Sequence, residues 1–233
     1  MNFNMNNWLN RTENLIGESA LNRLIHSNIA IVGIGGVGSF CAEALARCGI
    51  NNITLIDKDV VDITNINRQI IADTTTLNEL KVNVMKERIL KINPSANVTT
   101  HPVFLNNENI PELIPIDCDF VIDCIDNVKS KLDLIEYCYK KDIKIISSMG
   151  TGNKLDPTKF EISDINKTSV CPLAKVIRKE LRKRCIPNLK VVYSKEEPKK
   201  ENISETSPAS ISFVPSSAGL IIASEVVKTL LNR

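Results

Sequence analysis

The sequence predicts an α/β protein with a mostly parallel β-sheet, helices on both faces of that sheet, and a C-terminal α/β extension. Three observations carry this prediction. Short apolar strands alternate with amphipathic helices over the first 150 residues, an order that builds a parallel sheet. A glycine-rich turn at 33–38 joins the first of these strands to a helix, and Asp57 ends the next strand.

The glycine turn predicts a nucleotide site of the Rossmann-like kind. It contains four glycines, three of them spaced as G-x-G-x-x-G: Gly33, Gly35, Gly36 and Gly38. Such a turn needs backbone angles that a side chain disfavours, and it lets a phosphate approach the main chain. The helix that follows directs free N–H groups and a positive dipole end toward that phosphate. Asp57 lies 19 residues beyond Gly38, where a carboxylate can bind ribose hydroxyls.

The other elements of residues 1–150 follow from apolar periodicity and from cap and turn signals. Strands are expected at 29–32, 53–56, 98–103, 119–124 and 143–148. Helices are expected at 13–26, 39–48, 77–92 and 129–140. Thr76 and Glu79 form a candidate capping box at the start of the third of these helices.

The pattern changes after residue 150. We therefore interpret 1–233 as one domain with a nucleotide-binding core, 1–150, and a substrate-side extension, 151–233. The extension is expected to contain a strand at 160–165, a basic helix at 172–184, a short strand at 211–214 and a helix at 217–231. The polar stretch 194–210, with two prolines and many charges, is expected to be a mobile loop.

Composition narrows the class of protein. With 43% hydrophobic and 24% charged residues, the chain is typical of a soluble globular protein. No apolar run approaches the ~20 residues of a membrane span, and the opening MNFNMNNWLN does not resemble a signal peptide, so we expect a cytoplasmic protein without a membrane partner. The seven cysteines include no C-x-x-C pair and the two histidines lie far apart, so we expect reduced thiols and no zinc site.

The residues after the second strand distinguish an ATP site from a nicotinamide site. Asn65 and Arg68 lie three positions apart on one side of a helical turn, and a guanidinium there can hold a polyphosphate through two hydrogen bonds. Lys81 supplies another positive charge, and Asp126 places a carboxylate that could hold Mg²⁺. Two cations and a metal suit a triphosphate whose pyrophosphate leaves, whereas a nicotinamide dinucleotide needs none of them.

Together these motifs resemble the E1-like (ThiF/MoeB/HesA) superfamily of ATP-dependent adenylating enzymes, over almost the whole chain. They are GIGGVG at 33–38, D-x-D at 57–59, N-x-x-R-Q at 65–69, Lys81 and Asp126-Asn127. The resemblance implies an ATP site formed by Gly33, Gly35, Gly36, Gly38, Asp57, Asp59, Asn65, Arg68, Gln69 and Lys81. It implies that Asp57 binds ribose and that Asp126 holds Mg²⁺. Arg68, Lys81 and Asp126 are the implied catalytic residues.

Further roles are implied by the same resemblance. Asn65 and Gln69 would orient the phosphate chain, and Asp59 would lie near the adenosine or the metal. Arg11, in NRTENLIG, resembles the N-terminal arginine that reaches across a homodimer into the neighbouring ATP site.

Within the superfamily the chain is similar to the branch of tRNA threonylcarbamoyladenosine dehydratases. The matching segments are R-T-E-x-L-x-G from Arg11, Pro-Leu-Ala-Lys at 172–175 and the stretch 210–220. The absence of C-x-x-C pairs also fits, because sulfur-carrier activators usually bind zinc with them. The branch implies adenylation of the carboxylate of N6-threonylcarbamoyladenosine in tRNA, followed by cyclisation with release of AMP and pyrophosphate. A sulfur-relay protein is a further partner that this resemblance allows.

Charge distribution gives an independent indication of RNA. Residues 167–200 contain eleven Lys or Arg and three Glu, a local balance of +8, which leaves −6 for the rest of the chain. In the predicted basic helix five cations recur along one stripe, which we interpret as a tRNA-binding face: Lys175, Arg178, Lys179, Arg182 and Lys183. The opposite face is expected to pack through Leu173, Val176, Ile177 and Leu181. A solvated amphipathic helix without RNA is the alternative interpretation.

Cysteine chemistry is a second open question, because some E1-like enzymes form thioester or persulfide intermediates. Cys171 and Cys185 flank the basic helix and are the exposed candidates for such a role. Cys41, Cys48 and Cys124 lie in apolar patterns typical of core residues. The ring closure requires no enzyme nucleophile.

Three other functions remain possible at this point. The protein could adenylate the C-terminal glycine of a ubiquitin-like sulfur carrier with the same ATP chemistry. A nicotinamide dehydrogenase would leave Arg68, Lys81 and Asp126 without a role. A non-catalytic RNA- or protein-binding module is disfavoured by the intact set of ATP residues.

Overall fold

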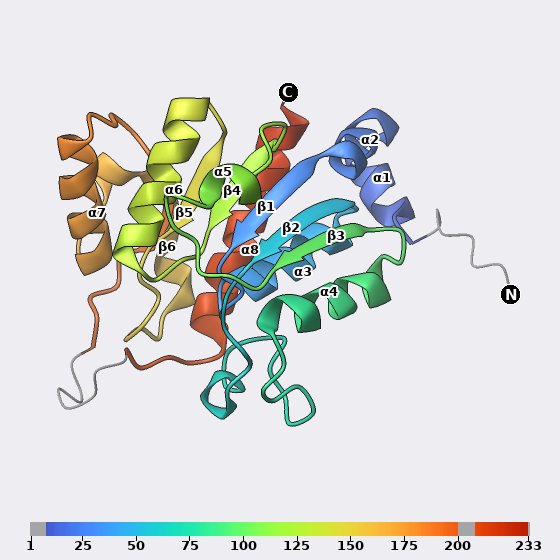
Figure 1. Ribbon diagram of the computed structural model, residues 1–233, viewed down its shortest axis with the longest axis horizontal. Helices are drawn as coiled ribbons and strands as arrows, with labels where there is room; N and C mark the ends of the chain where they lie inside the picture. Colours follow the sequence, from blue (N-terminus) through green and yellow to red (C-terminus); the bar gives the residue numbers. More distant parts are fainter. Residues whose placement is uncertain (1–7, 200–207, 233) are drawn as a thin grey trace, which may run out of the picture.

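The computed structural model describes residues 8–199 and 208–232, drawn in colour in Figure 1. Within these residues seven strands form one sheet in the order β3-β2-β1-β4-β5-β7-β6. The strands are β1 Asn28–Val32, β2 Asn52–Ile56, β3 Asn97–His101, β4 Phe120–Asp123, β5 Ile145–Ser148, β6 Phe160–Asp164 and β7 Lys190–Ser194. Neighbouring strands pair in parallel, except that β6 pairs antiparallel with β7. The predicted fold class, Rossmann-like with a C-terminal α/β extension, is confirmed.

Helices cover both faces of the sheet (Figure 1). They are α1 Asn10–Ile16, α2 Glu18–His26, α3 Gly38–Arg47, α4 Lys81–Ile92, α5 Ile110–Leu113, α6 Val128–Lys141, α7 Pro172–Lys183 and α8 Phe213–Leu231. The central strand β1 shows the two faces, because successive side chains of a strand point to opposite sides. Ile29 and Ile31 pack in a core with α3, α4 and α8, whereas Ala30 and Val32 pack with α5 and α6.

The sheet order places one crevice where nucleotides bind in such folds. Connections leave β1 toward one side of the sheet and β4 toward the other, so the carboxyl ends of β1 and β4 border a topological switch point. The glycine turn follows β1 and the segment 124–127 follows β4. A Cβ atom on Gly33 would lie 2.7 Å from the carbonyl oxygen of Cys124, so the two segments are in contact.

Several predicted elements differ from those in the structure. The helix expected at 13–26 is divided at Gly17, whose φ of 85° ends α1 and begins α2. The helix expected from residue 77 begins at Lys81, and the Thr76–Glu79 capping box is wrong. The Thr76 hydroxyl instead donates to the carbonyl of Ile71 and accepts from the N–H of Asp73. Those bonds build a turn before the helix.

The C-terminal half contains the larger corrections. The strand expected at 211–214 is wrong, because α8 begins at Phe213, four residues before the expected helix, and residues 211 and 212 belong to no strand. Strand β7 was not predicted, and the expected loop 194–210 begins on its last residue. Residues 200–207 of that loop lie outside the described residues.

Helix α8 is long and apolar enough, by length and composition alone, to cross a membrane, with a mean hydropathy of 1.3. This stretch differs from the expectation that no apolar run approaches the length of a membrane span. Half of this stretch is buried in the structure, and the helix packs against α3 and α2. Its apolar residues Val214, Ala218 and Ile222 belong to the main core, so packing accounts for their character.

Candidate nucleotide-binding site

A cavity of about 610 Å³ lies at the carboxyl ends of the parallel strands. Most of the residues predicted to bind ATP line it: Gly33, Gly35, Gly36, Asp57, Asp59, Asn65, Arg68, Gln69 and Lys81. Asp126, the predicted metal residue, lines it as well. Gly38 does not line the cavity but begins α3, and Arg11 is exposed on α1 without contributing to the lining. Residues far apart in the sequence thus meet around one space.

The glycines meet different local demands. Gly33 has a φ of 91° and lies against Cys124, so any side chain there would be strained and would collide. A Cβ atom on Gly38 would lie 1.8 Å from the carbonyl oxygen of Gly33, so α3 can start against the turn only from a glycine. At Gly35 the nearest atom to such a Cβ is the Nε2 of Gln69, at 3.9 Å. Gly35 therefore borders open cavity that a phosphate could fill.

Asp57 joins the glycine turn to the end of β2. Its carboxylate accepts hydrogen bonds from the N–H groups of Ile34, at 2.6 Å, and Asp59, at 2.8 Å. Burial outweighs these bonds and raises the pKa of the Asp57 carboxyl above its usual value. A carboxylate has about four lone-pair sites, so it retains capacity for ribose hydroxyls.

A short 3₁₀ turn, Ile63–Asn65, orients the N-x-x-R-Q motif. The Asp62 side chain accepts from the N–H of Thr64, and the Asn65 side chain accepts from the N–H of Asp62, so the turn is capped in both directions. Arg68 extends from this turn and donates to the carbonyl of Thr64 at 2.8 Å. The capped turn therefore directs one face of the motif to the cavity.

Gln69 provides a test of whether the cavity suits a ligand. Its side chain is 6% exposed, and its Oε1 atom is buried without a hydrogen-bond partner. Buried polar atoms are rarely unpaired, so an unpaired one in a cavity wall calls for a donor from a bound molecule. With the glycine turn and the cations nearby, this orphan atom fits a nucleotide.

Lys58, Lys81, Asp59 and Asp126 add their charges to those of Asp57 and Arg68 in the cavity wall. Lys81 is the first residue of α4, is 6% exposed, and its Nζ lies 3.4 Å from Asp59 Oδ2. Burial disfavours the charged form of Asp59, but a hydrogen bond from Lys58 and the charge of Lys81 hold its pKa below the usual range. Asp126 is exposed to the cavity, next to Asn127, which caps α6. No group of three or more His, Cys, Asp or Glu that could hold a metal occurs in the described part of the chain.

The model of the ThiF family matches residues 9–233. The chain belongs to the ThiF family. A Bacillus subtilis relative called tRNA threonylcarbamoyladenosine dehydratase is 44% identical, over 95% of this chain and 93% of that protein. The Escherichia coli protein of the same name is 44% identical over 73% of this chain and 64% of its own length.

Solved structures extend the comparison. The E. coli tRNA N6-threonylcarbamoyladenosine dehydratase, solved in complex with ATP, is similar with a TM-score of 0.89 at 35% identity, and the match covers 95% of this chain and 93% of that one. The same enzyme in complex with AMP has a TM-score of 0.90, with the same identity and coverage. The fold of this ThiF-family chain is therefore that of an enzyme solved with both nucleotides.

The basic helix of this ThiF-family protein divides into two kinds of cation. Arg178 Nη1 donates to the hydroxyl and carbonyl oxygens of Thr168, so it anchors the segment before α7. Lys183 pairs with Glu180 at 2.7 Å. Lys175, Lys179 and Arg182 are exposed.

The packed face of α7 differs in one position from the expectation. Ala174, Ile177 and Leu181 are buried, whereas Val176 is 45% exposed. The predicted membership of Val176 in the packed face is therefore wrong, because the helix presents Ala174 to the core instead.

The cysteines are also redistributed. Cys171, expected to be exposed, is 4% exposed, because it precedes α7 and packs with Ala174 and Ile177. Cys185 is exposed, as expected. Cys124 lines the cavity, and burial raises its pKa to about 12, so the thiol form is strongly favoured there.

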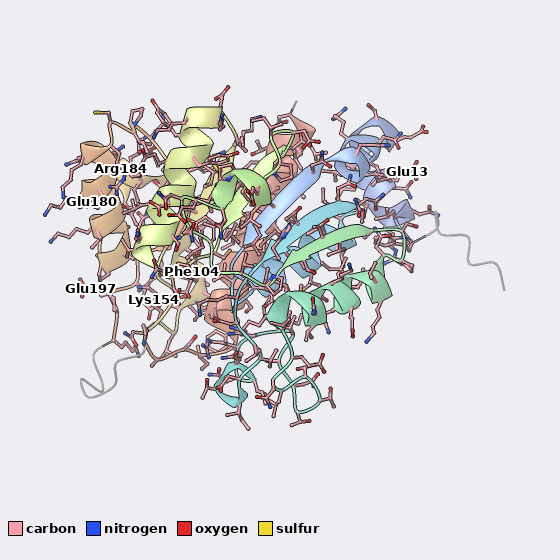
Figure 2. The ribbon with its side chains drawn as sticks, in the orientation of Figure 1. Glu13, Phe104, Lys154, Glu180, Arg184 and Glu197 are labelled. Atoms are coloured by element: carbon pink, nitrogen blue, oxygen red, sulfur yellow. The ribbon has the colours of Figure 1, made fainter. Side chains whose placement is uncertain are left out.

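Sequence reasoning missed an apolar part of the cavity wall. Val103, Phe104 and Leu105 line it, and Phe104, labelled in Figure 2, is 46% exposed. The strand expected at 98–103 ends earlier, at His101. Pro102 was the available signal, because a proline disfavours continuation of a paired strand. Thr151, Ser210 and Pro215 also line the cavity. Ser210 and Pro215 belong to the matching stretch 210–220, but none of the three was predicted as a site residue.

Proposed function

We propose that this ThiF-family protein is an ATP-dependent tRNA threonylcarbamoyladenosine dehydratase, a cyclising ligase that works through an acyl-adenylate. The observation that carries the proposal is the single cavity in which the glycine turn, Asp57, Arg68, Lys81 and Asp126 meet. That set suits a triphosphate that loses pyrophosphate. The full-length similarity to dehydratases supports the substrate, and it favours them over sulfur-carrier activators.

The first step is adenylation. The threonyl carboxylate of the modified adenosine attacks the α-phosphate of ATP, the bond to the β-phosphate breaks, and pyrophosphate leaves. Arg68 and Lys81 neutralise the charge that develops on the phosphates. Asp57 holds the ribose, and the backbone N–H groups at the start of α3 bind phosphate. Asn65 and Gln69 orient the phosphate chain, and Asp59 keeps Lys81 in place.

The second step is ring closure. The neighbouring carbamoyl group attacks the activated carbonyl, a ring forms, and AMP leaves. The net change in the tRNA is loss of one water, whose oxygen departs with AMP. Both reacting groups belong to one nucleoside, so proximity supplies much of the rate and no enzyme nucleophile is needed.

Mg²⁺ fits this site as a metal that arrives with the nucleotide. Asp126 would hold it together with the phosphates, and its chemistry there is charge neutralisation. The proposal includes no zinc, since the chain has no C-x-x-C pair.

The tRNA is proposed to contact α7. The predicted face consists of Lys175, Arg178, Lys179, Arg182 and Lys183. Arg178 and Lys183 already have protein partners. The stronger candidates are the three exposed cations that have none in the described residues: Lys175, Lys179 and Arg182. Their spacing of four and three positions places them on one side of the helix. Exposed cations in such a row suit an RNA backbone.

The remaining proposals concern organisation. We propose a cytoplasmic homodimer in which Arg11 reaches the neighbouring ATP site, and a sulfur-relay protein as a further partner. We also propose one domain, with residues 1–150 as nucleotide-binding core and 151–233 as substrate-side extension. The contacts of α8 with α3 support a single folding unit.

The decisive experiment supplies purified protein with ATP, Mg²⁺ and tRNA that carries N6-threonylcarbamoyladenosine. We expect the cyclic nucleoside, one water lighter, by mass spectrometry of digested tRNA, and AMP in equal amount. Pyrophosphate exchange that requires a ubiquitin-like carrier protein, and not modified tRNA, would contradict the proposal and favour carrier activation.

A further inference from the structure

A fully buried ion pair lies next to the nucleotide cavity. The side chains of Lys131 and Asp123 are both 0% exposed, and Nζ of the lysine is 2.8 Å from Oδ2 of the aspartate. Such a pair adds little net stability, because the cost of removing two charges from water offsets their attraction. Stability alone therefore does not account for it.

Hydrogen bonds fix this pair in one arrangement. The Lys131 ammonium donates to Asp123 Oδ2, to the Ser147 hydroxyl at 3.1 Å and to the Ser148 carbonyl at 3.1 Å, which uses its three protons. The Ser147 hydroxyl in turn donates to Asp123 Oδ2 at 2.6 Å. The other oxygen, Oδ1, accepts from the N–H of Ile125 at 3.0 Å.

The network joins three elements at the edge where the cavity opens. Asp123 ends β4, Ser147 and Ser148 end β5, and Lys131 lies in the first turns of α6. The segment 124–127 runs between Asp123 and α6 and contributes four residues to the cavity wall. It is thus held at both ends by one pair of charges.

The same segment meets the glycine turn. The Cys124 carbonyl lies against Gly33, and Asp126 follows two residues later. The backbone N–H of Lys131 also donates to the carbonyl of Asn127 at 3.0 Å. A displacement of Lys131 would therefore move the Asp126 carboxylate relative to the turn that would bind phosphate.

We propose that Lys131 is a positioning residue for adenylation, acting with Asp123 to hold the segment 124–127 so that Asp126 meets the metal–nucleotide complex. This inference rests on the proposed function. Lys131 does not touch the nucleotide itself, because its side chain is fully enclosed by β4, β5 and α6.

The test compares wild type with the double variant K131M/D123N. The single variant K131M would leave a buried unpaired carboxylate and unfold, whereas the double variant removes both charges at similar volume. The amide oxygen introduced by D123N can still accept from the N–H of Ile125, so the change isolates the link through Lys131. Thermal melting, Kd for ATP with and without Mg²⁺, and kcat for cyclisation are measured.

We expect the double variant to melt near wild type and to bind metal-free ATP within about threefold of it. The gain in ATP affinity on adding Mg²⁺ should fall about tenfold, and kcat about 10–100-fold, as for other groups that orient a metal ligand. An unchanged Mg²⁺ gain with unchanged kcat would overturn the proposal.

A matched control removes another ion pair. Glu43 and Arg88 pair between α3 and α4 and do not line the cavity. E43Q/R88M should retain the gain in ATP affinity on adding Mg²⁺ and should retain kcat. If both double variants lost these two quantities equally, Lys131 would have only a structural role, and the inference would be overturned. Failure of the wild type to form the cyclic nucleoside would contradict the proposed function instead, while Mg²⁺-dependent ATP binding would still test the pair.

Discussion

Gly33 and Gly35 stand two positions apart in one turn, yet the structure leaves very different space for a side chain at each. Gly33 has a positive φ and lies against the Cys124 carbonyl, so an added Cβ would strain the backbone and collide. Gly35 has ordinary angles and open space beside it. Gly33 is therefore required by the fold. Gly35 is not, and in the proposed function it leaves space for a phosphate.

Replacing Gly35 by alanine should separate folding from binding. G35A is expected to change the free energy of unfolding by less than about 1 kcal/mol, because the backbone there accepts a side chain. Its Cβ would occupy the phosphate space and should weaken ATP binding by about tenfold or more. Urea denaturation and ATP titration measure the two effects. G33A is the contrasting variant and should lose stability first.

In the proposed mechanism, Arg68 neutralises charge that develops on the phosphates. R68A should lower kcat for adenylation about 10²–10³-fold, as loss of one donor to developing charge does in other enzymes. Stability should hardly change, because among the described residues the side chain bonds only within its own turn, to Thr64 and Asn67. Steady-state AMP formation and tRNA binding are the measurements, with K91A as a control on an exposed helix face. Full turnover by R68A would remove Arg68 from the mechanism.

At the scale of elements, α3 and α4 are joined by one carboxylate. Glu43 of α3 pairs with Arg88 of α4 and with Arg47 of its own helix. Burial disfavours the charged form of Glu43, but the hydrogen bonds and charges of the two arginines outweigh it and lower its pKa. Neither Glu43 nor Arg88 lines the cavity, so this pair holds the two helices together at a distance from the site.

The Glu43 pair predicts a pH-dependent stability difference. Because the folded pKa is below the unfolded value of about 4.3, the stabilisation is complete above that pH and is lost as pH falls through the folded pKa. E43Q should therefore cost about 1 kcal/mol at pH 7, a modest value because Arg88 and Arg47 are partly exposed. The difference from wild type should shrink at acid pH. Urea denaturation across pH 3–7 measures it, and a pH-independent difference would contradict the assignment.

For the whole molecule, the cavity and the basic helix lie at neighbouring parts of one edge. Gly150 comes shortly after β5 and precedes the cavity residue Thr151. A Cβ atom on Gly150 would lie 3.8 Å from the Sγ of Cys171, the residue that precedes α7. An RNA whose modified base enters the cavity would therefore find the cations of α7 beside it.

Removal of the three exposed cations should change tRNA binding through its salt dependence. K175A/K179A/R182A should weaken binding and make the slope of log Kd against log salt shallower by about two, since each lost phosphate contact contributes about 0.7–0.9. ATP binding should not change. Filter binding at several salt concentrations measures the slope.

The control for this variant is K91A/K141A/K144A, which removes equal charge. These exposed lysines lie near the amino ends of β3 and β5, at the opposite edge of the sheet. An equal change of slope in both triple variants would mean that net charge, and not α7, attracts the tRNA.

Motifs and strand alternation predicted the sheet, the glycine turn and the principal cavity residues, because these depend on local backbone geometry and on the direction of parallel strands. The errors arose where neighbours distant in the chain decide. The apolar residues at 211–214 suit either a strand or a helix, and packing on α3 selects the helix. Strand β7 is short and follows a basic helix, and it pairs only because β5 and β6 lie beside it.

By itself, the sequence determined the fold class and the ATP motifs, since glycine angles, strand order and residue spacing are written in consecutive residues. The tertiary structure decided which charges are available. Arg178 is engaged by Thr168 while Lys175 is exposed. Lys131 is enclosed with Asp123, although in the sequence it resembles any helical lysine. Burial and partners come from segments far away in the chain, and only folding brings those segments together.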